Sequence, residues 1–399
     1  MVTPATGSVV LINFPFSVLS RTKLRPAVVL ASAGFDDWIL CQLTSNPYAD
    51  KRAVRITTPD FVTGSLQRES YARPGKLFTA SARLMSVEAG RLGARKFDEV
   101  LAAVVGAFSA ANSPSNPYAG LVAGCLRSAK EGKTWPLGGF PKCPRPDVAS
   151  DAPNVLIFSP HPDDEVIIGG LALRLLREAK WKVINVAVTQ GSSKARQAER
   201  LRELRNCCDC IGFDLVQTAP NGLERVNVKT REQEPGHWAQ SVEVMAGILR
   251  EHRPRVILFP HEWDWNSSHI GTHHLVLDAL RSLPAGFTCY AVETEFWGQM
   301  QKPNLMVELS AEHVTDLITA LTFHVGEVRR NPYHLSLPAW MIDNVRRGAE
   351  LVGGQGGAAP DFVFGTLYRL RRWANGRLEE VYEGGRQLAC AGQPDSLVG

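Results

Sequence analysis

Hydrophobic residues in the first 79 positions occur in short runs, separated by clusters of Pro, Gly, Asn and Asp. Runs of this length are typical of β-strands, and their spacing favours a small barrel or a strongly bent sheet. The predicted strands are Ser8–Phe14, Ala27–Ala31, Trp38–Leu43 and Ala53–Ile56. A helical pattern at Phe97–Phe108 predicts a helix that closes this small β-barrel-like domain.

From residue 154 the pattern changes to apolar runs that alternate with helical segments. The predicted strands are Val155–Ser159, Val183–Val188, Leu215–Thr218 and Val256–Pro260. The predicted helices are Val166–Ala179, Ala195–Ile211, Trp238–Glu251 and Thr272–Arg281. This alternation predicts an α/β domain with a Rossmann-like, mostly parallel sheet that is flanked by helices. After Glu295 the alternation fades, and we expect scattered short elements there, including Asp361–Arg372.

Two domains are expected for a chain of 399 residues, because one hydrophobic core seldom serves so many. The strongest breaker of regular structure is Ser113-Pro114-Ser115-Asn116-Pro117. We therefore predict a β-barrel-like domain at residues 1–112 and an α/β domain at residues 154–399. Residues 113–153 are predicted to form a linker and lead-in, with a helix at Tyr118–Ser128 and a loop at Pro136–Pro153.

Composition places the chain among ordinary soluble globular proteins, with 44% hydrophobic and 21% charged residues. The sequence shows neither a signal peptide nor an apolar run long enough to span a membrane, so we expect a cytoplasmic protein. Eight cysteines are too few and too irregular for a disulfide framework. Cys207, Cys208 and Cys210 are interpreted as half-buried thiols of a helix.

The net charge of +4 is unevenly distributed along the chain. Residues 1–110 contain 13 Lys and Arg against 8 Asp and Glu, whereas the remainder contains 31 against 32. Only the first part is therefore suited by charge to meet a polyanion.

Two polar segments follow predicted strands of the α/β domain. His161-Pro162-Asp163-Asp164-Glu165 follows the first strand, and a histidine-rich segment from His261 to His274 follows the last. Ligands of open α/β sheets bind at the carboxyl ends of strands. Imidazole and carboxylate donors fit Zn²⁺ best, with Fe²⁺ and Mn²⁺ as alternatives. Because a catalytic zinc needs three protein ligands and one open position, we assign one zinc ion to His161, Asp164 and His269.

Asp163 receives a separate role, because neighbouring side chains in a tight loop diverge. We predict that it faces a water at the metal and acts as the general base of a hydrolase. For Glu165 two interpretations stay open: it is a residue of the site, or it is an acid that caps the next helix. On a helix, His273 would share a face with His269, whereas His261 is interpreted as a surface or satisfied core residue.

Four features of the α/β domain occur in a fixed order: Pro160-His161-Pro162-Asp163-Asp164-Glu165, Thr189-Gln190-Gly191-Ser192, Arg200-x-x-Glu203-Leu204 and His269. Together they resemble the PIG-L/LmbE-like zinc-dependent deacetylases, over about residues 115–399. The resemblance implies removal of the acetyl group from N-acetylglucosamine units of small conjugates. It implies zinc on His161, Asp164 and His269, with Asp163 as the base. It also implies that Arg200 contacts a polar or anionic substrate group, and an ion pair with Glu203 is the alternative.

One segment departs from that family, which usually has His-Pro-Asp-His where this chain has Asn266-Ser267-Ser268-His269. The amide of Asn266 can donate a hydrogen bond to a tetrahedral intermediate, but it cannot give a proton to the leaving amine. Either His273 or Asp264 compensates, or the site hydrolyses a different amide or an ester. Phosphoester hydrolysis would need a second metal site, which the sequence does not show.

The front domain contains five segments in the order of another family: Gly7–Leu11, Phe14–Phe16, Lys23–Leu30, Leu43–Ser45 and Ser70–Thr79. Over residues 7–108 they resemble the MazF/PemK toxins, barrel-like endoribonucleases that cleave single-stranded RNA. The resemblance implies that Arg25 and Thr44 catalyse cleavage without a metal, and that Arg73 and Lys76 hold backbone phosphates. Gly75 stands where several members have an acidic residue.

Two interpretations of the front domain stay open. It is either an RNA-cleaving or RNA-binding module, or a non-catalytic module that binds a protein partner. The N-acetylated substrate of the α/β domain and the oligomeric state are also left open by the sequence.

Overall fold

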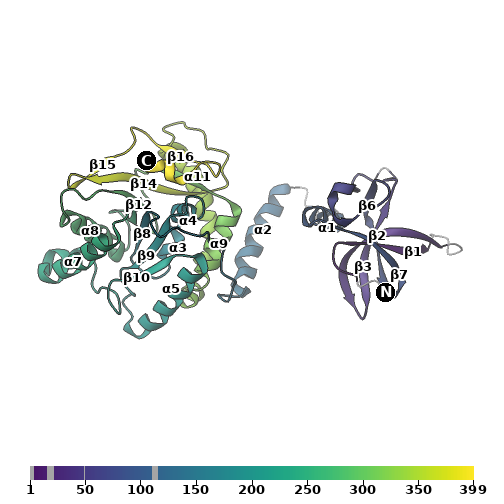
Figure 1. Ribbon diagram of the computed structural model, residues 1–399, viewed down its shortest axis with the longest axis horizontal. Coiled ribbons are helices and arrows are strands. Elements are labelled where there is room, and N and C mark those ends of the chain that lie inside the picture. The colour runs from purple at the N-terminus through teal and green to yellow at the C-terminus, as the bar shows by residue number, and fades with distance from the viewer. Residues whose placement is uncertain (1–3, 16–21, 49, 110–115) are drawn as a thin grey trace. The chain divides into compact units, whose positions relative to one another are not determined.

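The computed structural model describes residues 4–15, 22–48, 50–109 and 116–399. The chain forms two compact units, Met1–Gly124 and Cys125–Gly399 (Figure 1). The predicted domain boundary after residue 112, with most of the breaker segment, lies outside the described residues. Helix α2 (Pro117–Glu131) follows and contains the predicted helix Tyr118–Ser128. Within the described ranges, no helix is long and apolar enough to cross a membrane.

The first unit is built on a seven-stranded sheet with the order β4-β6-β3-β2-β1-β7-β5, in which the paired strands are antiparallel. Its strands are β1 (Ser8–Pro15), β2 (Thr22–Gly34), β3 (Asp37–Thr44), β4 (Val54–Ile56), β5 (Phe61–Gly64), β6 (Ser70–Ser81) and β7 (Met85–Leu92). Val9 packs in one core with helix α1 (Ala94–Ser109), whereas Val10 packs in a second core. Because successive residues of a strand face opposite sides, the sheet buries both faces, as a curled sheet does. The predicted strands and closing helix are confirmed, but β5, β6 and β7 were not predicted as strands.

The second unit contains five parallel strands in the order β10-β9-β8-β11-β12 (Figure 1). These strands are β8 (Asn154–Ser159), β9 (Lys182–Ala187), β10 (Asp214–Gln217), β11 (Val256–Pro260) and β12 (Cys289–Thr294). The chain adds β9 and β10 on one side of β8, and β11 and β12 on the other. The loops that follow β8 and β11 therefore leave the sheet at a point where the strand order reverses, which is where open α/β sheets place their ligands.

Helices cover both faces of this sheet. Val155 and Ile157 of β8 belong to one core with helices α4, α5 and α9, whereas Leu156 and Phe158 belong to a second core with α7 and α8. The helices are α3 (Asp164–Ile167), α4 (Gly170–Arg177), α5 (Gln197–Ile211), α6 (Val228–Gln233), α7 (Pro235–His252), α8 (Ser267–Arg281), α9 (Ala311–Leu321), α10 (Val325–Arg330) and α11 (Leu337–Leu351). The predicted alternation of strands and helices over residues 154–282 is thus confirmed.

The predicted single helix Val166–Ala179 was wrong, because α3 and α4 are separate helices. The hydroxyl of Tyr368 lies at the break between them. It donates to the carbonyl of Ile168 (2.7 Å) and accepts from the amide of Leu171 (3.0 Å). A side chain from the far end of the sequence thus satisfies the backbone groups that the break exposes.

Beyond β12 the chain extends the sheet. Strand β14 (Phe364–Ala374) pairs antiparallel with β12 and with β13 (Leu305–Leu309). Two short strands follow: β16 (Arg386–Leu388) pairs parallel with β13, and β15 (Arg377–Glu380) pairs antiparallel with β14. The element expected at Asp361–Arg372 is present as β14, but the region also contains the longer helices α9 and α11, so the expectation of only scattered short elements after Glu295 was wrong. Arginines interrupt the apolar alternation of β14, although most of its residues are buried.

Candidate metal centre

The loop after β8 brings three polar side chains to the carboxyl edge of the sheet. Asp163 has a φ of 118°, which lies in the left-handed region that favours glycine. Asp164 begins helix α3, and its Oδ2 accepts a hydrogen bond from the amide of His161 (2.8 Å). The Thr189 hydroxyl, from the second motif, donates to the carbonyl of Pro160 (2.7 Å). These bonds fix the loop in one conformation.

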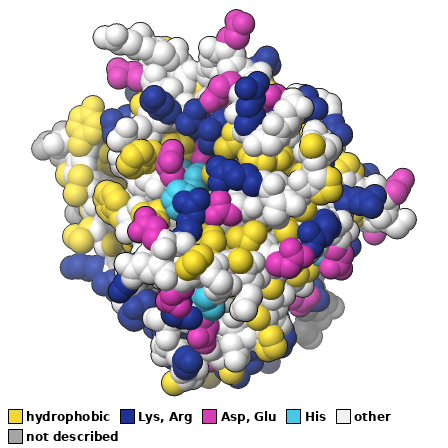
Figure 2. Space-filling model, turned by 90° about the vertical axis from the view of Figure 1, so that its left-hand side faces the viewer, with side chains coloured by type: hydrophobic (Ala, Val, Ile, Leu, Met, Phe, Trp, Pro, Cys, Tyr) yellow, Lys and Arg dark blue, Asp and Glu magenta, His cyan; other side chains and the backbone are white. Residues whose placement is uncertain are grey.

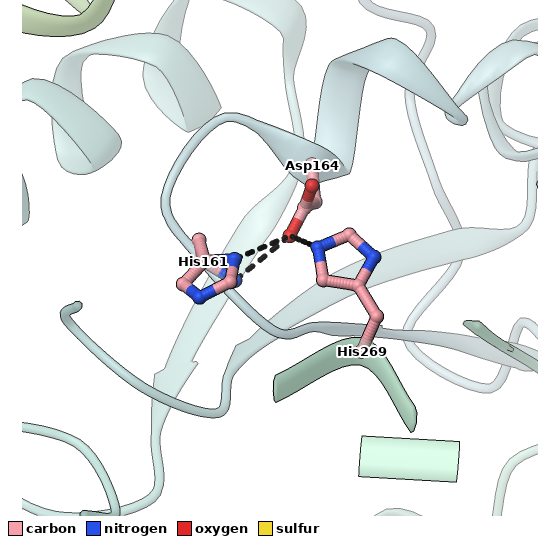
Figure 3. A group of neighbouring side chains, drawn as sticks. All are labelled: His161, Asp164 and His269. Atoms are coloured by element: carbon pink, nitrogen blue, oxygen red, sulfur yellow. Dashed lines mark hydrogen bonds and ion pairs between the residues drawn. The ribbon is translucent and has the colours of Figure 1, made fainter. Parts of the chain in front are cut away.

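His161, Asp164 and His269 lie together at this edge (Figure 3). Asp164 Oδ2 is 3.6 Å from His161 Nδ1 and 3.4 Å from His269 Nε2. His269 comes from the first turn of α8, which begins at Ser267 and so five residues earlier than predicted. One donor atom from each of the three residues lies within 4.8 Å of the other two. The structure thus brings together the three residues that the sequence assigned to a metal.

The polar atoms of this cluster fit a cation. Asp164 Oδ1 and both ring nitrogens of His269 are buried and make no hydrogen bond, which is costly unless a ligand binds there. Burial opposes charge on Asp164, but His269 and His161 hold its pKa below the ordinary value. Burial likewise opposes protonation of His269, but Asp164 and Asp264 raise its pKa. The cluster therefore favours positive charge, and its two imidazoles and one carboxylate suit zinc.

Asp264 supports the cluster from behind His269. Its Oδ2 lies 3.6 Å from His269 Nδ1, the ring nitrogen that faces away from Asp164. The same carboxylate accepts hydrogen bonds from the amides of Trp297 (3.1 Å), Gly298 (3.4 Å) and Asn266 (2.8 Å). A carboxylate in this position fixes the orientation of a ligating imidazole.

Asp163 lies beside the cluster but has other partners. The hydroxyl of Tyr333 donates to Asp163 Oδ2. Burial and the neighbouring Asp164 raise the pKa of Asp163 to about 7, against the opposing effects of His324, Arg200 and the Tyr333 hydrogen bond. A carboxyl group that titrates near neutral pH can take up and release a proton, as acid–base catalysis requires.

A second buried cluster stands behind Asp163. His324 Nε2 lies 2.7 Å from Glu165 Oε1, and Glu165 Oε2 accepts from the amide of Asp163 (2.9 Å). Cys207 completes the cluster, and burial raises the pKa of its thiol well above the ordinary value. Because that thiol stays protonated and Glu165 is already paired, we interpret the cluster as support for the Asp163 backbone.

Cys207, Cys208 and Cys210 are fully buried, and not half-buried as predicted.

Arg200 binds the loop after β8. Its Nη2 donates to the carbonyl of Pro162 (3.1 Å), and its Nε lies 3.8 Å from Glu327 Oε1. Glu203 instead accepts from the amide of Gly326 (2.8 Å), so the alternative ion pair between Arg200 and Glu203 does not form.

In the second unit, Asn266 and His273 are the two remaining residues that the sequence placed in catalysis. Asn266 caps α8: its Oδ1 accepts from the amide of Ser268 (2.9 Å), which leaves the amide nitrogen as a donor. His273 is buried, and its Nδ1 lies 2.9 Å from the carbonyl of Pro260 while its ring contacts Phe259. Burial lowers the pKa of His273 to about 3. These contacts give no support to a role of His273 as an acid.

A cavity of about 560 Å³ opens beside the cluster. It is lined mainly by polar residues, among them His161, Ser192, Lys194, Gln197, Asn227 and Asn266. Gly191 also lines it. A Cβ there would lie 2.2 Å from Arg200 Nη1, so a larger residue at this position would displace the guanidinium. On the face drawn in Figure 2, histidine side chains reach the surface among acidic and basic ones and beside hydrophobic ones.

In the first unit, the pairing of Ala27 with Gln42 places Arg25 and Thr44 at the same end of neighbouring strands β2 and β3. Thr44 is buried, and its Oγ1 accepts from the amide of Asn46 (3.3 Å). The four candidate residues of this unit therefore lie on three strands that are adjacent in the sheet, β2, β3 and β6.

Strand β6 bulges where it pairs with β3, between Ala72 and Leu77. The bulge carries Arg73 and Lys76, and bulges commonly redirect side chains next to functional sites. The guanidinium of Arg73 lies 5.0 Å from the centre of the Tyr48 ring, and Lys76 is exposed.

Two family models match the chain. The first, for GlcNAc-PI de-N-acetylase (PIG-L), matches residues 156–280, which contain the loop after β8 and His269. Residues 156–280 thus resemble the PIG-L family. The second model, for PemK-like, MazF-like toxin of type II toxin–antitoxin systems, matches residues 5–108. Both resemblances seen in the sequence are thereby confirmed.

Solved structures resemble each unit at low identity. N,N'-diacetylchitobiose deacetylase from Pyrococcus horikoshii is 17% identical, with 63% of this chain and 91% of that chain covered and a TM-score of 0.42. 4-Carboxy-2-hydroxymuconate hydratase from Pseudomonas putida is 16% identical, with 55% and 95% covered and a TM-score of 0.41. An endoribonuclease from a mycobacterial species, solved with its cognate antitoxin, is 13% identical, with 27% and 96% covered and a TM-score of 0.22. A search of the curated proteins gives no match.

Sequence reasoning missed two residues that the second unit brings close to Asp163. Tyr333 and His324 come from the region after Glu295, where the sequence has neither a motif nor a clear periodicity. Their positions depend on the packing of α9 and α10 against the sheet, which no local pattern predicts.

Proposed function

We propose that the second unit is a zinc-dependent N-deacetylase that acts on an acetylated amino sugar within a small conjugate. The observation that carries the proposal is the cluster of His161, Asp164 and His269, with unpaired buried donor atoms, beside an aspartate of raised pKa. These three residues would hold the zinc, which supplies Lewis acidity toward the amide carbonyl and the attacking water.

Asp163 would take a proton from that water as the C–O bond forms. The amide nitrogen of Asn266 would donate a hydrogen bond to the developing oxyanion. When the C–N bond breaks, Asp163 would return the proton to the amine, so that acetate and a free amine leave. The buried contacts of His273 and the ties of Asp264 to His269 leave Asp163 as the best-placed proton donor.

The cavity beside the cluster would bind the acetylated sugar. Sugars present hydroxyl groups on all sides, and the lining offers matching groups in Gln197, Asn227 and Lys194. The guanidinium of Arg200 already donates to the carbonyl of Pro162 and pairs with Glu327. We therefore propose that Arg200 positions the loop after β8 and does not bind substrate directly.

Acetate release is the direct test. The purified full chain, loaded with Zn²⁺ and in parallel with Fe²⁺ or Mn²⁺, is incubated with N-acetyl amino sugars, their glycosides, and matched esters. We expect acetate from the amide substrates and strongest activity with zinc. Hydrolysis of the esters alone would contradict N-deacetylation, and a greater rate with Fe²⁺ would contradict the choice of metal.

For the first unit we propose binding and cleavage of single-stranded RNA. The observation that favours it is the bulge of β6, which carries Arg73 and Lys76 next to the strand ends of Arg25 and Thr44. Arg73 lies 4.0 Å from Asp50, and an RNA phosphate would compete for the same guanidinium. The full chain with chelator present should cleave RNA, and Arg25→Ala should not. Failure to bind any RNA at low salt would favour a module that binds a protein partner.

A further inference from the structure

Three tryptophans near the metal cluster are exposed to solvent. The exposed fractions of Trp263, Trp265 and Trp297 are 69%, 79% and 42%. An indole is a large apolar group, so several in one place on a surface indicate a binding site. Two of them flank Asp264, the carboxylate behind His269.

The two loops that carry these tryptophans are fixed to each other. Asp264 accepts from the amides of Trp297 and Gly298. His261 Nε2 lies 2.8 Å from the carbonyl of Gly298, and its Nδ1 accepts from the amide of Trp263 (3.2 Å). A Cβ on Gly298 would lie 2.6 Å from the Trp263 carbonyl oxygen, so the two backbones are in direct contact. The indoles therefore extend from a rigid base, which lowers the entropy lost on binding.

Ring contacts connect this base to the metal cluster. Phe296 stacks on His269 with ring centres 5.5 Å apart, and Trp297 meets Phe296 edge-on at 4.6 Å. The segment 262–270 also lines two cavities. Its residues Asn266 to Ser268 line the cavity beside the cluster, whereas residues from Glu262 to Trp265 and Ile270 line a second one, of about 860 Å³.

We propose that the second cavity binds another sugar ring of the same substrate, so that the enzyme acts on an oligosaccharide or glycoconjugate; this rests on the proposed deacetylase function. A pyranose has an apolar face of C–H groups and a rim of hydroxyls. Trp263 and Trp265 offer flat apolar surfaces, and Gln299 and Gln301 offer amides to the rim. The acetylated ring would occupy the first cavity, and the next ring would cross the segment 262–270.

The surrounding charges favour a sugar over a membrane surface. Interfacial tryptophans that meet anionic lipids stand among lysines and arginines. Here the exposed neighbour of Trp263 is Glu262, and the cavity is lined by the carboxylate of Asp264. The cation in its lining, Arg347, is ion-paired with Glu295 and Asp343. A neutral ligand with many hydroxyls suits this lining. Hydroxyl groups both donate and accept hydrogen bonds, and the carboxylates and amides of the lining provide acceptors and donors.

Tryptophan fluorescence tests the proposal apart from turnover. In an Asp163→Asn background, the full chain is titrated with N-acetylglucosamine and with its β-1,4-linked dimer and trimer. We expect the dimer to bind about tenfold more tightly than the monomer, and Trp263→Ala or Trp265→Ala to remove most of that difference. Trp265→Phe should keep part of it, because a flat ring remains. Trp135→Ala, at an indole that is 54% exposed outside both cavities, is the control.

The kinetic test uses the same variants with Asp163 intact. KM for the dimer should rise about tenfold in Trp265→Ala, with KM for the monomer and both kcat values unchanged. Equal affinity for monomer and dimer, or equal losses for both in the variant, would overturn the second subsite. Dimer binding that depends on the tryptophans without acetate release would instead retain the subsite and overturn the proposed reaction.

Discussion

Asp163 and Asp164 are neighbours in the sequence but have different surroundings. Asp164 contacts two histidines, whereas Asp163 contacts Tyr333 and has a raised pKa. Asp163→Asn keeps the shape of the side chain and removes its ability to accept a proton. We expect amide hydrolysis to fall by about a hundredfold or more with zinc content unchanged, measured as acetate release and metal content of one sample.

Asp209→Asn provides the matched control, because Asp209 pairs with Lys142 on the surface of α5. It should change neither quantity. Loss of zinc together with activity in Asp163→Asn would show that Asp163 is a metal ligand and that the division of the two aspartates is wrong.

Zinc binding should be lost when a ligand is removed and only weakened when Asp264, which orients His269, is changed. His269→Ala removes one of three donors, so the purified protein should contain almost no zinc. Asp264→Asn leaves the donors in place but weakens the orientation of His269, so zinc affinity should fall by about 10- to 100-fold in competition with a chelator. His274→Ala, on the same helix but outside the cluster, should bind zinc normally. Full occupancy in His269→Ala would contradict the assignment.

The contact of helix α8 with the end of β11 should make stability depend on pH. His273 lies in that contact with its pKa lowered to about 3 by burial, so it is neutral in the folded chain. Its pKa in the unfolded chain is higher, so the unfolded state binds the proton first as the pH falls. Between pH 6.5 and 5 this should cost about 2 kcal/mol of unfolding free energy.

Between the same two pH values, the unfolding free energy of His273→Gln should fall by about 2 kcal/mol less than that of the unchanged protein. Urea unfolding at both pH values measures the two losses. Ser282→Ala, at the end of α8, changes no titratable group and is the control, and its pH dependence should match that of the unchanged protein. If His273→Gln loses as much stability as the unchanged protein, His273 does not cause the dependence.

The elements that the sequence predicted correctly are those whose apolar pattern is local. Strands β8 and β11 contain continuous apolar runs, and Asn185 alone interrupts the run of β9. The polar segments that begin at Pro160, Thr189 and His261 follow these strands. The break between α3 and α4 could not be predicted in this way, because it depends on the hydroxyl of Tyr368. Tyr333 was missed for the same reason: it meets Asp163 through packing between distant segments.

At the scale of the whole molecule, the two units differ in charge as well as in fold. The excess of cations in residues 1–110 should make RNA affinity fall steeply with salt, because phosphate contacts release counterions. In the full chain, Arg73→Ala should weaken binding and flatten the salt slope by about one unit, measured by fluorescence anisotropy at several salt concentrations. Arg83→Ala removes an exposed cation outside the bulge and should have little effect. An equal loss in both variants would indicate unspecific attraction.

At position 163, the aspartate that catalysis needs lowers the stability of the protein, because its backbone is left-handed. A residue with a side chain is strained at a φ of 118°, and its carboxylate is buried next to another. Asp163→Gly would relieve both effects, so the variant should melt at a higher temperature while losing hydrolysis. Directed evolution that rewards heat resistance alone would therefore tend to discard the base, and selection for a more robust enzyme has to retain activity as a condition.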